Sequence, residues 1–162
     1  MYQEYTWYTD GSCLKNPGGP GGWAFTCVEH PEFTRSDCDT NTTNNIMEMT
    51  ACIECIKFIV SHQLTNHMHS IYTDSVYVKN GINCWIHTWL KNNWKTSNKQ
   101  DVKNKALWMT LHEQSQHVIL EWNWVKGHNN NPYNEKVDEL ARQAAKSICN
   151  EFQCSKDPFL KK

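Results

Sequence analysis

Four acidic residues of this 162-residue chain are placed so that they could share one site. Asp10 and Asp74 each follow a Tyr-Thr pair that closes a run of strand-forming residues. Glu48 lies one helical turn before Cys52 on the apolar stripe of a helix pattern, and Asp138 stands in the segment NEKVDELA near the start of another helix. Four converging carboxylates repel one another and raise their own pKa values unless a cation offsets their charge. The set therefore predicts a metal site.

The ligand chemistry of these acids indicates which metal they would bind. Oxygen-only ligands select hard cations, so we expect Mg²⁺, with Mn²⁺ as the alternative. Two such ions, about 3.5–4 Å apart, can activate a water and stabilise the leaving oxygen of a phosphodiester. In this hypothesis Asp10 contacts both ions, with Glu48 and Asp74 on one side and Asp138 on the other. The pattern favours a metal-dependent nuclease, and the sequence has no H-E-x-x-H motif or paired C-x-x-C motifs to support a zinc hydrolase.

Three strands are predicted at the start of the chain, over residues 3–10, 23–29 and 32–40. The glycine-rich stretch 11–22 between the first two is expected to be a turn region. Because no helix pattern separates these strands, we expect them to pair antiparallel.

The rest of the chain alternates helix and strand patterns. A helix over about 44–60 is predicted from an apolar stripe at helical spacing, with a threonine N-cap. Later elements are predicted as a strand over 67–73, helices over 76–92 and 101–115, a strand over 117–125, and a helix over 134–149. The order implies an α/β fold with a five-stranded mixed sheet, the first three strands antiparallel, and helices packed on both faces. We expect one domain over residues 1–150 and a C-terminal tail over 151–162.

The composition excludes some classes of protein. No apolar run reaches the length of a membrane helix, and no secretory signal is visible, so we expect a cytoplasmic protein without a membrane partner. Eight cysteines raise the possibility of disulfides, but reduced thiols are favoured in that compartment. Cys52 and Cys55 form a C-x-x-C that lies inside the helix pattern and is expected to be part of the core.

The formal net charge of −1 conceals an uneven distribution. Residues 1–74 contain nine acids and three cations, a net charge of −6. Residues 75–105 carry a net charge of +5, and Trp85, Trp89 and Trp94 lie among their lysines. Cationic and aromatic side chains together suit a sugar–phosphate backbone, so this stretch favours a nucleic-acid partner.

Four segments of the chain together resemble the type 1 ribonuclease H family. They are YTDGSCLKNPGGPGGWA, TTNNIMEMTA, YTDSVYVKNGINCWI and WVKGHNNNPYNEKVDELA, and they occur in the family's order across about residues 3–149. The resemblance implies an RNase H-like fold. It also implies endonucleolytic hydrolysis of the RNA strand of RNA–DNA hybrids, leaving 5′-phosphate and 3′-hydroxyl ends.

The resemblance also assigns roles to individual residues. It makes Asp10, Glu48, Asp74 and Asp138 the catalytic metal ligands, and it gives His128 a part in proton transfer or product release. Positions that match the family's substrate contacts are Cys13, Asn16, Asn44 and Asn45 at the minor groove, Thr43 and Asn104 at a DNA-strand phosphate, Trp85 at a deoxyribose, Lys91, Lys95 and Lys99 in a basic protrusion, and Asn134 beside the site. The chain departs from the family at two contact positions, where many members have Arg in place of Asn41 and Gln in place of Val76.

Two other functions stay open at this stage. One is a module that binds hybrids without cutting them, and the other is a polynucleotidyl transferase of the same fold. The presence of all four acids disfavours the first, and the WVKGH segment with the basic stretch disfavours the second. We expect the protein to act as a monomer on an RNA–DNA hybrid duplex.

Overall fold

The chain forms a five-stranded mixed sheet, as the sequence predicts. The structure is a computed structural model that describes residues 3–127 and 130–155. The strands are β1 (Glu4–Cys13), β2 (Gly19–Cys27), β3 (Thr34–Thr42), β4 (Met68–Thr73) and β5 (Ile119–Trp124), in the spatial order β3-β2-β1-β4-β5. β1, β2 and β3 pair antiparallel, whereas β4 and β5 add in parallel on the other side of β1.

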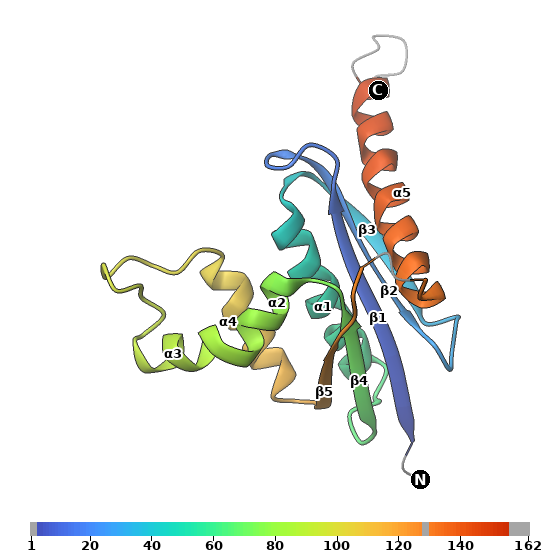
Figure 1. Cartoon of the computed structure of the whole chain (residues 1–162). Coiled ribbons are helices and arrows are strands. Elements are labelled where there is room, and N and C mark those ends of the chain that lie inside the picture. Colours follow the sequence, from blue (N-terminus) through green and yellow to red (C-terminus); the bar gives the residue numbers. More distant parts are fainter. Residues whose placement is uncertain (1–2, 128–129, 156–162) are drawn as a thin grey trace.

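Helices cover both faces of the sheet, and Figure 1 shows α1 and α5 on opposite sides of it. The helical elements are α1 (Asn44–Ser61), α2 (Val76–Asn80), the π-helical segment η1 (Gly81–Trp85), α3 (Ile86–Lys91), α4 (Lys105–Ser115) and α5 (Pro132–Ser155). Side chains alternate along the strands, so Trp7 and Phe25 join the core under α1, whereas Tyr8 and Ala24 join the core under α5. None of the helices in the described ranges is long and apolar enough to cross a membrane.

The glycine-rich stretch was the main error in the predicted elements. Residues 19–22 belong to β2 instead of a turn, and β1 continues past Asp10 to pair with them. The glycines are needed for close packing: a Cβ on Gly22 would lie 2.3 Å from the carbonyl oxygen of Ala141 in α5. The absence of side chains here lets α5 lie against the sheet.

Several boundaries also differ from the predicted ones. β3 spans Thr34–Thr42 instead of 32–40, and α4 begins at Lys105 because Asn104 adopts a left-handed conformation. α5 begins at Pro132, which is favourable at a first helical position, and continues past the predicted end at residue 149. No Gly or Pro interrupts the helix before Pro158 in the sequence.

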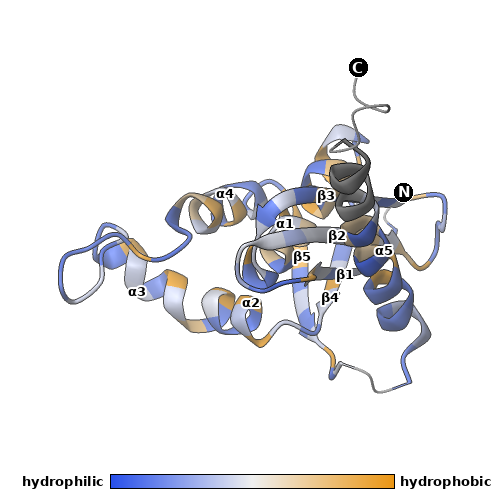
Figure 2. Ribbon diagram, turned by 90° about the horizontal axis from the view of Figure 1, so that it is seen from above, coloured by the Kyte–Doolittle hydropathy of each residue, from blue (hydrophilic) through white to orange (hydrophobic). Residues whose placement is uncertain are grey.

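The segment from α2 to α4 extends away from the sheet, and the loop at its far end is hydrophilic (Figure 2). α2, η1 and α3 follow one another without a break over the range predicted as a single helix. This arm carries six lysines and only two acids, so it is positively charged.

The six cysteines between residues 13 and 84 lie in the core or at the surface. Cys27, Cys52 and Cys55 are buried free thiols, and Cys84 is an exposed one. Burial raises the pKa of Cys52 to about 12. The C-x-x-C pair is therefore part of the apolar stripe of α1, as predicted from its helical spacing.

Gly22→Ala should lower the free energy of unfolding by about 1–3 kcal/mol, because the new Cβ forces α5 away from β2. At this chain length the expected fall in Tm is about 2–4 °C per kcal/mol, measured by thermal unfolding. The two nearest atoms to the new Cβ belong to the backbone of Ala141 and Ala145, so no shorter side chain in α5 relieves the contact. An unchanged Tm in Gly22→Ala would contradict the packing account.

Candidate active site

Unequal strand lengths create the site. β4 ends at Thr73, which pairs with Thr9, whereas β1 runs on to Cys13 and pairs only with β2 beyond that point. Asp10 therefore lies just past the end of β4, and Asp74 follows that end directly. The two acids therefore lie close together at the point where β4 ends and β1 continues.

Helix α1 brings the third acid into contact with β1. A Cβ on Gly11 would lie 2.3 Å from the backbone nitrogen of Glu48, so only glycine permits this approach. The Gly11 amide donates to Glu48 Oε1 at 2.8 Å and to Asp10 Oδ1 at 2.9 Å. The start of α1 is fixed by Thr43, whose side chain accepts from the amide of Ile46 at 3.1 Å.

Asp10, Glu48 and Asp74 form a tight cluster. One carboxylate oxygen from each lies within 4.8 Å of the others. Burial, together with the charge of Asp74, raises the pKa of Asp10 to about 8, and Asp10 is only 3% exposed. Burial and the charges of its two neighbours raise the pKa of Glu48 well above its usual range, and burial raises the pKa of Asp74. Such a cluster fits a hard divalent cation, which would offset the repulsion.

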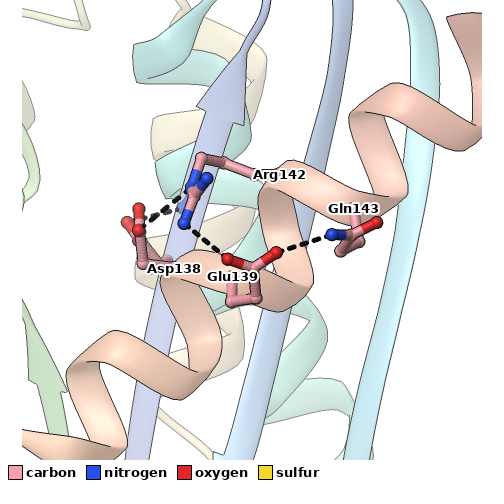
Figure 3. Close-up of polar contacts among 6 residues, drawn as sticks. Asp138, Glu139, Arg142 and Gln143 are labelled. Atoms are coloured by element: carbon pink, nitrogen blue, oxygen red, sulfur yellow. Dashed lines mark hydrogen bonds and ion pairs between the residues drawn. The ribbon is translucent and has the colours of Figure 1, made fainter.

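Asp138 lines the same open cleft but lies outside the tight cluster. Its Oδ2 accepts from Arg142 Nε at 3.2 Å (Figure 3). Arg142 Nη2 also donates to Glu139 Oε1 at 2.6 Å, and Gln143 Nε2 donates to Glu139 Oε2 at 2.6 Å. Asp138 thus faces the cluster while paired with a cation of its own helix.

The segment between β5 and α5 lies against Asp74. A Cβ on Gly127 would be 3.0 Å from Asp74 Oδ2, so the backbone passes close to this carboxylate. Asn134, at the start of α5, is buried and lies beside Asp74, where its hydrogen bond opposes the rise in the pKa of Asp74. The predicted His128 lies outside the described residues.

A tyrosine stack anchors the start of α5. Tyr8 stacks on Tyr72 and Tyr133, with ring centroids 4.9 and 5.5 Å apart. Asn131 Nδ2 donates to the Tyr8 hydroxyl at 3.2 Å, while its Oδ1 accepts from the amides of Tyr133 and Asn134 at 3.0 Å. This residue therefore caps α5 and ties it to β1.

Comparison with known proteins identifies the family. The RNase H family model matches residues 2–146. Ribonuclease H of Treponema pallidum is 46% identical over 155 residues, and the match covers 87% of this chain and 90% of the relative. Ribonuclease H of Hydrogenovibrio crunogenus is 48% identical over 143 residues, and the match covers 88% of this chain and 95% of the relative. The chain belongs to the ribonuclease H family. The solved structure of LC9-RNase H1, described as a type 1 RNase H with the type 2 active-site motif, has 29% identity and a TM-score of 0.79, covering 91% of this chain and 74% of that one.

Several positions that match ribonuclease H substrate contacts border the acidic cleft. Asn44 and Asn45 line it, and Asn16 Oδ1 accepts from the Asn44 amide at 3.1 Å. Cys13 lies nearby in β1, where its Sγ donates to the carbonyl oxygens of Gly19 and Thr42 at 3.6 and 3.5 Å. The first turn of α1 and the end of β1 thus form one rim.

A second group of matching positions lies around Tyr77. Trp85 forms an open aromatic pocket with Tyr77, Trp89 and Lys103. Asn104 Nδ2 donates to the Tyr77 hydroxyl at 3.0 Å. Since Tyr77 also lines the acidic cleft, it connects the aromatic pocket to the acids.

The basic protrusion is a loop closed by its own hydrogen bonds. Lys95 pairs with Asp101 across a β-bridge, and its Nζ lies 2.6 Å from the carboxylate. The Thr96 amide donates to the Gln100 carbonyl at 2.7 Å, and the Lys99 amide donates to the Thr96 carbonyl at 2.9 Å. Lys91 and Lys99 are exposed and form no ion pair within the described part of the chain.

Sequence reasoning missed Tyr77 and Arg142. Tyr77 stands three residues after Asp74 in the segment YTDSVY, and Arg142 stands four residues after Asp138, the spacing of a helical ion pair. Of the two departures, Val76 is 54% exposed at the edge of the cleft, and Asn41 is an exposed residue of β3.

Asp10→Asn should stabilise the metal-free protein at high pH, because it removes one of three repelling charges. The pKa of Asp10 is about 8 in the folded protein, against a usual value of 3.8. The free energy of unfolding of the wild-type chain therefore falls as the pH rises between these two values. We expect the variant to melt at least about 3 °C higher at pH 9. At pH 4 the two proteins should melt together.

Thermal unfolding with a chelator present measures this difference. Asp39→Asn, an exposed acid of β3, serves as the control for a simple change of net charge. A lower Tm for Asp10→Asn than for wild type at pH 9 would contradict a repulsive cluster.

Proposed function

We propose that this protein is an endoribonuclease that hydrolyses the RNA strand of RNA–DNA hybrids at the acidic cleft. The observation that carries the proposal is the cluster of Asp10, Glu48 and Asp74 in a chain of the ribonuclease H family. The products are RNA fragments with 5′-phosphate and 3′-hydroxyl ends. Relatives named ribonuclease H that align over most of their length support this reaction.

The proposed cofactor is Mg²⁺, with two ions per site when substrate is bound and Mn²⁺ as a substitute. Asp10, Glu48, Asp74 and Asp138 would hold these ions, since all four offer oxygen ligands to one cleft. When bound, the ions supply a water of lowered pKa and stabilise charge on the leaving oxygen.

The chain's own groups prepare this chemistry. The Gly11 amide fixes the carboxylates of Asp10 and Glu48, so that neither must reorganise when a cation binds. Glu48 also lines the cleft, where its carboxylate can orient a water against the 2′-hydroxyl of the RNA. His128 is proposed to transfer a proton or assist product release, a role suited to a group that titrates near neutral pH.

Substrate binding is proposed to use the rim formed by α1 and β1 together with the aromatic pocket around Tyr77. Asn16, Asn44 and Asn45 with Cys13 contact the minor groove, where an amide can donate to and accept from a 2′-hydroxyl. Thr43 and Asn104 bind a DNA-strand phosphate, Trp85 packs on a deoxyribose, and Asn134 supports the site next to Asp74. LC11-RNase H1, a protein solved in complex with an RNA/DNA hybrid, has a similar fold, with a TM-score of 0.67 at 16% identity. The match covers 90% of this chain and 99% of that one.

Three further points belong to the proposal. The protein acts as a monomer, in the cytoplasm, without a membrane partner. Residues 1–150 form the catalytic domain, and residues 151–162 form a tail. The α5 backbone continues to Ser155, so the helix crosses this boundary.

A labelled duplex panel tests the reaction. RNA–DNA, RNA–RNA and DNA–DNA duplexes of one sequence are incubated with and without Mg²⁺. Cleavage of the RNA strand of the hybrid alone, only with metal, is expected. Binding without cleavage would favour a hybrid-binding module, and strand joining would favour a polynucleotidyl transferase.

Asp10→Asn should lower the rate of hybrid cleavage with Mg²⁺ by at least about 100-fold, a rise of roughly 2.7 kcal/mol in the barrier. The variant loses one of the three clustered carboxylates proposed to hold the metal. Its circular dichroism spectrum should match the wild type, and Asp39→Asn is the activity control. Activity close to wild type would contradict the assignment.

Replacing lysines of the protrusion should weaken hybrid binding and flatten its salt dependence. Each lost phosphate contact reduces the slope of log Kd against log salt by up to about 0.9. Lys91→Ala and Lys99→Ala should each have a larger effect than Lys95→Ala, because Asp101 already offsets the charge of Lys95. Fluorescence anisotropy across a salt series measures the slopes, and an unchanged slope in the triple variant would show that the protrusion does not bind phosphates.

A further inference from the structure

Asp138 differs from the other three acids of the site because it pairs with a cationic side chain. Within residues 3–127 and 130–155 it alone among the four acids forms an ion pair, with Arg142. The atoms of Asp10, Glu48 and Asp74 are mutually close, whereas Asp138 is absent from that cluster although it lines the same cleft. One oxygen of its carboxylate, Oδ2, is thus held by a protein cation at the edge of the cleft.

Arg142 is itself held in place. Glu139 accepts from its Nη2 at 2.6 Å, and Gln143 fixes the other oxygen of Glu139 at the same distance (Figure 3). The hydrogen bond from Gln143, followed by the charge of Arg142, lowers the pKa of Glu139, so this carboxylate stays ionised. The guanidinium therefore bridges two carboxylates of one helix and is oriented toward Asp138 before any ion binds.

The bridge is weak enough for a divalent cation to displace it. The side chains of Arg142 and Asp138 are 43% and 24% exposed, so water screens their attraction. A divalent cation in the cleft meets three carboxylates already assembled by the core. The fourth, Asp138, is the carboxylate that Arg142 also binds, through its Oδ2.

We infer that Arg142 is a positioning residue that holds Asp138 away from the metal until a divalent cation displaces it, and so sets the cation concentration at which the site fills. The inference rests on the proposed function, because it requires a divalent cation in the acidic cleft. Arg142 contacts Asp138 and, within the described residues, does not line the cleft itself.

Arg142→Gln should fill the site at a lower Mg²⁺ concentration. We expect the concentration that gives half of the Mg²⁺-dependent rise in Tm, without substrate, to fall about five-fold or less, which corresponds to about 1 kcal/mol. Calorimetric titration with Mg²⁺ should give the same shift. The concentration for half-maximal cleavage of the hybrid should move in the same direction.

Two variants separate this effect from a change in net charge. Lys146→Gln removes the same charge one turn further along α5, from a lysine that makes no bond to Asp138. It should therefore shift the midpoint, the Mg²⁺ concentration that gives half of the rise in Tm, by less than Arg142→Gln. In an Asp138→Asn background, Arg142→Gln should shift the midpoint no more than Lys146→Gln does. These two results together support the inference.

A failure of this inference can be told apart from a failure of the proposed function. An Arg142→Gln midpoint equal to that of Lys146→Gln, or higher than wild type, would overturn the role of Arg142 and leave the proposed function standing. A wild-type protein whose Tm and heat of titration do not respond to Mg²⁺ or Mn²⁺ would overturn both.

Discussion

The backbone contact between Gly11 and the first turns of α1 is the constraint on which the site depends. β1 and α1 approach so closely at this point that a single methyl group would meet the helix backbone. The contact sets the position of Glu48 against β1, and the Gly11 amide joins Glu48 to Asp10. Because β4 stops one residue short of Asp10, Asp74 completes the group without a loop of its own. The acids are therefore held by the core and not by flexible segments.

The burial of these acids has two opposing effects. Burial gives the acids fixed positions but raises their pKa values, since each carboxylate loses water and gains a negative neighbour. The apolar core under α1, with Trp7 and Phe25 at its centre, provides the stability that such a cluster lowers. A divalent cation that binds only the folded chain recovers part of that stability.

Much of the fold could be predicted from periodicity and strand-end acids. Glu48 was identifiable because an acid on a buried helical stripe needs a partner, and the mixed sheet followed from the order of the elements. The strand at residues 19–22 could not be predicted, since glycines there signal a turn unless one knows that the chain packs closely on them, as α5 does on Gly22. Similarly, the Tyr8 stack depends on which face of α5 meets the sheet, which a single sequence does not specify. The Arg142 bridge, by contrast, lies within α5, and its four-residue spacing was a signal in the sequence.

The protrusion has a consequence for the entropy of binding. Its tip is closed by the bridge between Lys95 and Asp101 and by the hydrogen bonds of Thr96 with Gln100 and Lys99. If a duplex docks on this loop as proposed, the loop is already folded and does not lose backbone freedom, so only the lysine side chains would become ordered. Loosening this tip would therefore weaken binding even if every positive charge were kept, and the loss would be entropic in origin.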